Sequence, residues 1–244
     1  MNRVVSLYEL AFRTGLNAAI TFFVFFIFLY FGGILLYALA LHFLKKDFGF
    51  HAIQHNLRKG QISFEIRQSL LSIFIFSLQA IPLQFLVAQG YATVSFSNAW
   101  VLLWQIPVLF LWNEIHFYLV HALLHRKWLM KKVHYVHHKS KEPTLYSVYS
   151  FHWFEAFLLG TVIFLPMTLY TFHFLAILSL PILSIVLNLM GHSNHEAHSE
   201  KEPQHISRFI FRHSMHHKWS NGNFGFMLPY LDQLFNTKLP KNKN

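Results

Sequence analysis

The stretch HFYLVHALLHRKWLMKKVHYVHH (residues 116–138) follows an apolar run and is the densest histidine segment of the chain. A second triplet, HSMHH (residues 213–217), repeats the spacing of HYVHH (residues 134–138) far downstream. All but three of the 18 histidines lie between His116 and His217, and the chain has no cysteine. Because histidine is the commonest metal ligand among side chains, this pattern indicates a metal site built from imidazoles.

The composition indicates a membrane protein. Hydrophobic residues make up 54% of the 244 residues, charged residues only 12%, and there are 28 phenylalanines. A soluble domain with this balance would expose large apolar patches and aggregate. The net charge of +10 does not indicate nucleic acid binding, because the basic residues lie in short loops between apolar runs. The absence of cysteine excludes disulfides, thiolate zinc sites, iron–sulfur clusters and thiol catalysis.

Several apolar stretches are long enough to cross a bilayer, for which about 20 residues suffice. Residues 18–44 carry no charge, and further spans are expected at residues 68–90 and from residue 99 into the first histidine cluster. Residues 156–190 form two more spans or a hairpin that enters the membrane and returns. We therefore expect an all-α fold, an integral membrane helical bundle of about four to five apolar segments with a histidine-rich helical cap.

The charges of the loops predict which face carries the histidines. The loop 45–67 is basic, as is the segment after His125, whereas residues 91–98 and the turn at 171–173 carry no charge. Basic loops remain in the cytoplasm, so all the histidine clusters are expected on the cytoplasmic face.

The spacing of the histidines predicts shared helical faces. His121 and His125 are separated by four residues, which places both imidazoles on one face of a helix. Each H-x-x-H-H triplet has offsets of three and four residues and is also expected to present one face. Eight imidazoles exceed the four ligands that a zinc site normally takes, so two metal ions fit the count better. His116 and Glu114 lie off the face of His121 and are expected beside the ligands rather than among them.

These segments resemble the integral-membrane fatty acid hydroxylase and sterol desaturase superfamily. The resemblance covers residues 113–237, half of the chain, with the motifs in the family's order. They are YLVHALLH (118–125), HYVHHKS (134–140), FHWFE (151–155, with Trp153 where the family has proline), GHSN (191–194), HSMHH (213–217), NFG (223–225) and DQLFNT (232–237). The resemblance divides the chain into an N-terminal transmembrane region (1–112), a fatty acid hydroxylase-like domain (113–237) that includes the hairpin at 156–190, and a basic tail (238–244).

The resemblance implies a membrane-bound di-iron oxygenase that hydroxylates or desaturates an unactivated C–H bond of a fatty acyl, sterol-like or other lipid substrate. It implies two iron ions, which zinc can replace in purified protein, and a histidine ligand set. The implied ligands are His121, His125, His134, His137, His138, His192, His195, His213, His216 and His217. Four further residues are expected to surround and orient these ligands, namely His152, Glu155, Asn223 and Asp232.

The reaction requires O2 and two electrons, and the sequence has no Gly-rich dinucleotide motif and no haem-attachment pattern. We therefore expect an electron-donor protein, cytochrome b5-like or ferredoxin-like with its reductase, beside the lipid substrate and the membrane. A zinc-dependent membrane hydrolase is the alternative, with the same histidine cluster and a carboxylate base such as Glu155 or Glu196.

Overall fold

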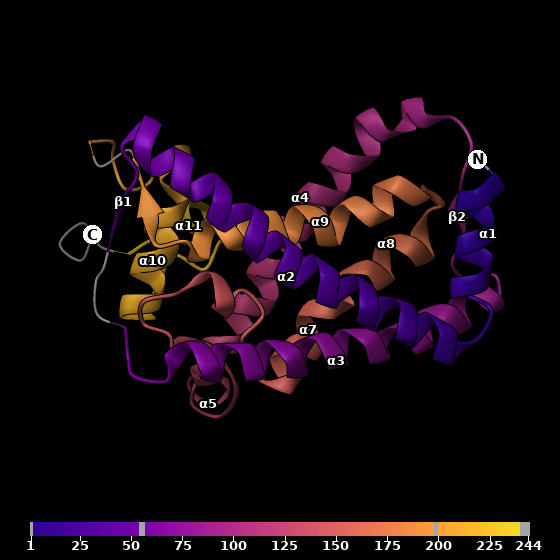
Figure 1. Cartoon of the computed structure of the whole chain (residues 1–244), viewed down its shortest axis with the longest axis horizontal. Coiled ribbons are helices and arrows are strands. Elements are labelled where there is room, and N and C mark those ends of the chain that lie inside the picture. Colours follow the sequence, from indigo (N-terminus) through magenta and orange to yellow (C-terminus); the bar gives the residue numbers. More distant parts are fainter. Residues whose placement is uncertain (1, 54–56, 198–199, 240–244) are drawn as a thin grey trace.

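The computed structural model describes residues 2–53, 57–197 and 200–239, and this part of the chain is almost entirely helical (Figure 1). Four helical segments are long and apolar enough to cross a membrane. They are α2 (Gly15–Phe48), α3 (Gln61–Ala88), α4 (Leu102–Leu124) with the preceding 3-10 turn η1 (Ala99–Val101), and α9 (Phe174–His192). The prediction of an all-α membrane bundle is thereby confirmed.

Helix α2 shows why these apolar runs become helices. In lipid, no water is available for backbone N–H and C=O groups, so a spanning segment must satisfy them internally. The helix begins where the Thr14 side chain accepts a hydrogen bond from Asn17 N, and it ends at Gly49, whose φ of 66° suits glycine. Many of its large side chains point outward, with Phe28 74% and Leu36 69% exposed, as expected for a helix with one face toward lipid.

Helix α3 begins earlier than the sequence pattern predicts. The expected span starts at residue 68, whereas the helix starts at Gln61 and takes Glu65 into the buried interior. The basic loop before it is correspondingly shorter than residues 45–67. The predicted start of the span is too late because charged residues were placed outside it. Glu65 can lie inside the protein because Gln61 and Ser140 donate hydrogen bonds to its carboxylate.

The apolar region 156–190 contains one spanning helix and one shorter, broken leg. The short leg consists of α7 (Trp153–Gly160), the 3-10 turn η4 (Thr161–Ile163) and α8 (Phe164–Leu169). The strand β3 (Phe172–His173) then leads into α9. The first leg is shorter than the four candidate spans and is interrupted by η4, which favours the hairpin over two full spans.

Each end of the bundle contains one short pair of strands. At one end, β2 (Val94–Ser95) pairs in parallel with β3, so the two uncharged loops lie together. At the other end, β1 (His51–Ala52) pairs antiparallel with β4 (His195–Glu196). Figure 1 shows β2 with the N-terminal helix α1 (Asn2–Ala11) at the right and β1 at the left. Segments that the charge pattern placed on a common face therefore lie at a common end.

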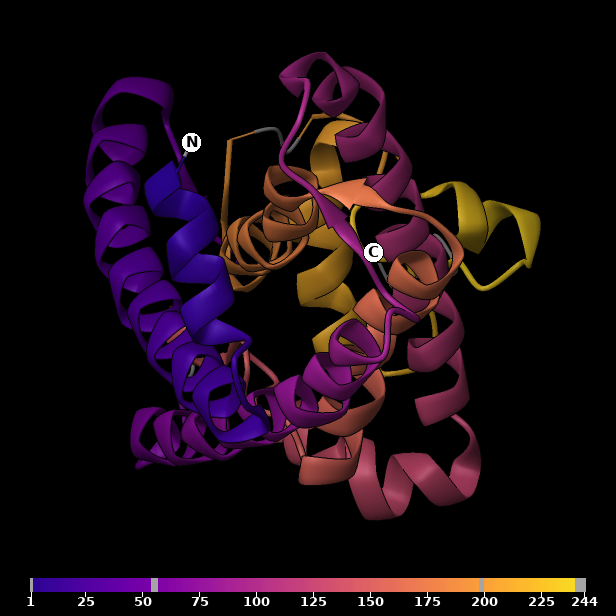
Figure 2. The same cartoon turned by 90° about the vertical axis from the view of Figure 1, so that its right-hand side faces the viewer.

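The remaining elements form a cap at the β1 end (Figure 1). They are α5 (Lys127–Leu129), the π-helical turn η2 (Met130–His134), α6 (Tyr135–His138), η3 (Leu145–Ser147), η5 (Ile206–Arg208), α10 (Phe209–Trp219) and α11 (Tyr230–Leu234). Seen from the opposite end, α1 and α2 lie on one side of the bundle and α4 on the other (Figure 2). Residues 240–244 of the expected basic tail lie outside the described residues.

Helices α2 and α9 approach closely at Gly33. A Cβ atom added there would lie 3.1 Å from Leu189 Cδ1 and 3.7 Å from Ile185 Cδ1. Gly32, its neighbour, would place a Cβ in open space with no atom within 4 Å. Small residues at helix contacts let membrane helices pack closely, so Gly33 and not Gly32 sets this distance.

We expect Gly33→Leu to lower the thermal unfolding midpoint of the detergent-solubilised protein by about 5 °C, because overpacking costs roughly 1–3 kcal/mol. Gly32→Leu is the matched control and should leave the midpoint unchanged or slightly higher, since leucine favours the helix. Equal shifts in the two variants would contradict the α2–α9 contact.

Candidate metal centre

Nine histidines gather in two groups within the cap. In each group, one ring nitrogen of every histidine lies within 4.8 Å of the corresponding atoms of the others. The five-histidine group contains His121, His125, His134, His138 and His216. The four-histidine group contains His137, His192, His213 and His217. All nine were expected to be ligands, and eight are buried, while His125 is partly buried.

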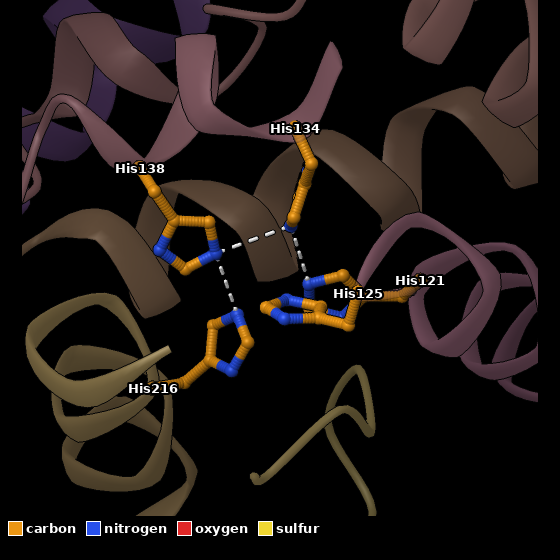
Figure 3. Close-up of side chains that lie close together, drawn as sticks. All are labelled: His121, His125, His134, His138 and His216. Carbon is orange, nitrogen blue, oxygen red and sulfur yellow. Dashed lines mark hydrogen bonds between the residues drawn. The ribbon is translucent and has the colours of Figure 1, made fainter. Parts of the chain in front are cut away.

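Four different segments bring the five-histidine group together (Figure 3). His121 lies in the last turn of α4, and His125 is the residue that ends this helix. His134 closes the π-helical turn η2, His138 ends α6, and His216 comes from α10. Figure 3 shows their rings pointing toward a common centre. The cap therefore positions these segments so that their histidine side chains converge.

The two H-x-x-H-H triplets are each divided between the groups. His134 and His138 belong to the five-histidine group and His137 to the four-histidine group, whereas α10 reverses this division and contributes only His216 to the five-histidine group. On an α-helix, a residue four positions along is rotated by about 40° in one direction, and a residue three positions along by about 60° in the other. The prediction that each triplet presents one face is therefore too coarse. Both groups share the same two helical segments and must be adjacent.

Hydrogen bonds at Nδ1 determine the tautomer of most of these rings. In four of them, Nδ1 contacts a backbone carbonyl, which can only accept, so Nδ1 carries the proton and Nε2 a lone pair. These pairs are His121 with Phe224 at 2.8 Å, His137 with Ser150 at 3.3 Å, His216 with Gly222 at 2.7 Å, and His217 with Ser140 at 2.9 Å.

His192 is held in the same way by a side chain. The Ser147 hydroxyl donates to Thr144 O at 2.6 Å and so has no second proton to give. His192 Nδ1 lies 2.6 Å from this hydroxyl and must donate to it, which leaves a lone pair on His192 Nε2.

In the four-histidine group, the close contacts between Nε2 atoms outnumber the protons available to form hydrogen bonds in them. His213 Nε2 lies 2.9 Å from His192 Nε2 and 3.1 Å from His217 Nε2. Because both neighbours present lone pairs, a proton on His213 Nε2 can satisfy only one of the two contacts. The second contact is explained by a cation bound between the lone pairs.

The five-histidine group also has fewer protons than close contacts between Nε2 atoms. Nε2 atoms lie 3.1 Å apart in a chain from His121 through His134 and His138 to His216. His121 and His216 present lone pairs, so these three contacts share at most two protons. His125 Nε2 is also buried without a hydrogen-bond partner. This arrangement suits a cation at the centre of the group.

Burial keeps these rings neutral. Loss of hydration lowers the pKa of His137 to about 3 and that of His216 to about 4. The pKa values of His138, His213 and His217 are also lowered well below the usual value, first by burial and then by neighbouring imidazoles. Neutral imidazoles are the form that binds metals, and iron, copper, nickel and zinc all accept them. The donor set of each group therefore fits one transition-metal ion.

Three of the four residues expected to orient the ligands do contact them or the loop that holds them. Glu155 Oε1 lies 2.8 Å from His134 Nδ1. Asp232 accepts hydrogen bonds from Phe224 N and Gly225 N and so shapes the loop whose carbonyl anchors His121. Asn223 Nδ2 donates to the backbone of α10 at Arg212 O. These carboxylate and amide groups support the ligands from outside, as is usual around metals.

Four further residues singled out in the sequence lie outside the two histidine groups. His195 lies in neither group of the described residues; its main chain pairs in β4, and its Nδ1 contacts Ser193 O at 2.6 Å. His152 caps α7 through Phe154 N and therefore acts on the helix that carries Glu155. His116 bonds Thr161 instead of a ligand, and Glu114 accepts from the backbone of Met227 and Leu228. Spacing alone could not place these side chains.

Glu65 is a supporting residue that sequence reasoning missed. This fully buried carboxylate accepts from Ser140 Oγ at 2.6 Å and Thr144 Oγ1 at 2.5 Å. Ser140 O anchors His217, and Thr144 begins η3, whose Ser147 anchors His192. The available signal was an acidic residue beside an apolar span, since such charges are seldom buried without a function.

A large apolar cavity of about 450 Å³ extends through the bundle toward these groups. It is lined by residues from α1 to α9, and most of them are apolar or aromatic. A small cavity of about 10 Å³ lies between the two histidine groups, lined by His121 and His134 of one and His192 and His213 of the other. Phe117, Phe151, Leu159 and Asn188 line both cavities. The large cavity therefore ends at the candidate metal centre.

Comparison with known proteins gives several relatives. The chain is 28% identical over 189 residues to lathosterol oxidase of Mus musculus, a match that covers 72% of this chain and 60% of the relative. It is 24% identical over 181 residues to a Delta(7)-sterol 5(6)-desaturase of Leptosphaeria maculans, covering 72% of this chain and 50% of the relative. A very-long-chain aldehyde decarbonylase of Oryza sativa is 31% identical over 143 residues, or 54% of this chain and 46% of the relative.

The chain spans about half to three fifths of the length of these relatives. No solved structure gives a significant match. A family model described as fatty acid hydroxylase matches residues 106–237, which is more than half of the chain and includes all nine grouped histidines. The chain therefore belongs to the fatty acid hydroxylase family, as the histidine motifs predicted.

Proposed function

We propose that this protein is a membrane-bound oxidoreductase that uses O2 to hydroxylate or desaturate an unactivated C–H bond of a lipid. The observation that carries the proposal is the position of two converging histidine groups at the end of an apolar cavity. The names of the relatives support it, since they include a sterol desaturase, a lathosterol oxidase and a methylsterol monooxygenase. A sterol-like or long-chain substrate agrees with these names and with the apolar lining.

The nine grouped histidines are proposed to hold two iron ions, one in each group. Iron bound there would supply the reduction of O2 and the oxidising power for the C–H bond. In five of the nine histidines, a hydrogen bond from Nδ1 to a carbonyl or to Ser147 leaves the Nε2 lone pair free for a metal. Since these anchors are buried, the ligands need no rearrangement on binding, which favours metal affinity.

The large cavity is proposed to bind the substrate. Its aromatic and aliphatic walls exclude water and leave the apolar substrate in an environment like the bilayer from which it enters. The small cavity between the histidine groups is too narrow for a lipid chain, so the reacting carbon is expected at the junction lined by Phe117, Phe151 and Leu159.

The electron donor is proposed to dock on the cytoplasmic face, next to the five-histidine group. Arg126, Lys127, Lys131 and Lys132 are exposed and lie directly after His125 in the chain. Such a surface suits an acidic partner, cytochrome b5-like or ferredoxin-like with its reductase, because complementary charge accelerates association. The same positive charges support the proposal that this face is cytoplasmic, because basic loops tend to remain in the cytoplasm.

The zinc hydrolase alternative requires a carboxylate that is available as a base. Glu196 is engaged with Arg208, with Oε1 at 2.6 Å from Nη2, and is therefore a poor candidate. Glu155 keeps one buried oxygen, Oε2, without a hydrogen-bond partner and remains the residue that a hydrolase would use. Metal identity and oxygen dependence separate the two functions.

We expect two metal ions per chain in the wild-type protein and one in either His216→Ala or His217→Ala, because these neighbours on α10 belong to different groups. The double variant should bind none. The measurement is metal content by mass spectrometry of protein purified under anaerobic conditions in iron-rich medium.

His42→Ala is the matched control, since His42 is exposed and lies outside both groups. A wild-type content of one ion, or loss of both ions in each single variant, would show that the two groups are not separate sites.

We expect cells that express the wild-type protein to contain an oxygenated or newly unsaturated lipid that is missing in cells with His137→Ala. His137 belongs to the four-histidine group and is anchored by Ser150 O, so alanine removes a ligand without touching the large cavity. Lipid mass spectrometry after growth with 18O2 provides the measurement, and a hydroxylated product should carry the label.

Product formation that continues without O2, in protein that contains only zinc, would contradict the oxygenase and favour the hydrolase. Identical lipid profiles in the two strains under aerobic growth would also count against the proposal.

A further inference from the structure

The chain after the second histidine triplet contains a long stretch with almost no charge. Residues 219–237 (WSNGNFGFMLPYLDQLFNT) include one charged side chain, Asp232, and it is only 2% exposed. An exposed lysine stands at each end of this stretch, Lys218 before it and Lys238 after it. A segment with apolar contents and basic flanks is typical of chain that enters a membrane and leaves it on the same side.

The short helix α11 in this stretch turns large apolar side chains outward. Tyr230 is 59% exposed, Leu234 70% and Phe235 55%. Tyr230 and Leu234 are four residues apart and share a face of the helix, whereas Asp232 points inward and accepts two backbone hydrogen bonds. Figure 2 shows this C-terminal segment, in yellow, projecting beside α4 at the edge of the bundle.

The outer side of α4 indicates how far the lipid extends along this edge. Exposed apolar side chains recur every three or four residues, at Leu111, Ile115, Leu119 and Leu123. Two exposed basic residues and the exposed Trp128 follow directly after the helix. Tryptophan and basic residues are enriched where a membrane meets water, so the lipid-facing stripe of α4 extends to about Leu123.

The uncharged stretch reaches well inside this lipid-facing part of α4. The carboxylate of Glu114 accepts hydrogen bonds from Met227 N at 3.1 Å and from Leu228 N at 2.9 Å. Glu114 lies about 15 Å before the end of α4, at 1.5 Å per residue. Farther toward the cap, the rings of Tyr118 and Phe235 stack with their centroids 5.3 Å apart. The segment therefore lies beside residues of α4 whose neighbours face lipid.

Buried charged groups satisfy the backbone of the segment at this depth. Irregular chain is tolerated at membrane depth only where its polar groups have partners in the protein. Glu114 accepts from two N–H groups, and Arg212 Nη2 donates to Met227 O at 2.7 Å. Asp232 accepts from Phe224 N at 2.7 Å and from the next N–H group at 2.8 Å. These contacts give the three buried charges a common role, namely to let the loop lie inside the membrane.

We propose that residues 224–237 form a re-entrant segment, which enters the bilayer from the side of the cap, rests on α4 and returns to the same side. The exposed face of α11 then contacts lipid acyl chains and continues the lipid-facing stripe of α4. Phe224 O, at the start of the segment, anchors His121, so the bilayer supports the loop that holds a member of the five-histidine group. The inference requires a membrane bundle but not the proposed reaction.

The test places a nitroxide spin label on the exposed face of α11. The chain has no cysteine, so Leu234→Cys provides a single labelling site in the full-length protein. The labelled protein is inserted into phospholipid nanodiscs that hold one chain each. Power-saturation electron paramagnetic resonance then gives the collision rates of the label with O2, which dissolves in hydrocarbon, and with a polar nickel chelate, which stays in water.

Two further variants provide matched references, Leu119→Cys on the lipid-facing stripe of α4 and Lys201→Cys at an exposed position of the loop before α10. We expect the ratio of O2 to nickel collisions at Leu234→Cys to equal that at Leu119→Cys. It should exceed the ratio at Lys201→Cys by roughly tenfold or more, because hydrocarbon excludes the polar chelate.

A ratio at Leu234→Cys equal to that at Lys201→Cys would show that α11 lies in water, and would overturn the inference. Low collision rates with both reagents would also overturn it, since they would mean that protein covers this face. If Leu234→Cys does not fold, Tyr230→Cys labels the same face of α11 and decides in its place. No turnover is measured, so an inactive protein can confirm the segment and an active oxygenase can lack it.

Discussion

The convergence of nitrogen lone pairs is the constraint on which the rest of this structure depends. Nine neutral imidazoles are held with ring nitrogens close to one another, and the contacts among the Nε2 atoms outnumber the protons available to them. Without a cation, this arrangement is repulsive, and burial prevents extra protons from relieving it. The fold must therefore supply enough hydrogen bonds at the Nδ1 side to keep every ring in place.

Those hydrogen bonds come from several parts of the chain, including the region before the family match. Glu65 of α3 holds both the loop that anchors His217 and the turn that anchors His192. Asp232 holds the loop that anchors His121 from the C-terminal side. The membrane bundle and the cap are therefore mechanically linked through buried carboxylates, and a change in the packing of α3 acts on the four-histidine group.

The helices that carry and support the histidines also enclose the large cavity. The helical bundle satisfies its backbone in lipid and leaves its side chains to line a space that ends between the histidine groups. Polar residues in that lining are few.

The sequence by itself determined the membrane bundle and the family, because apolar run length and i, i+4 spacing are local properties of a helix. It also predicted, as metal ligands, the nine histidines that the fold brings together in two groups. It could not decide that His195 pairs in β4, that α3 starts at Gln61, or that His137 joins a different group from His134 and His138. These outcomes depend on how separate helices rotate and approach one another. The role of Glu65 also required the tertiary structure, since Ser140 and Thr144 lie far away in the sequence and only packing brings them within hydrogen-bond distance.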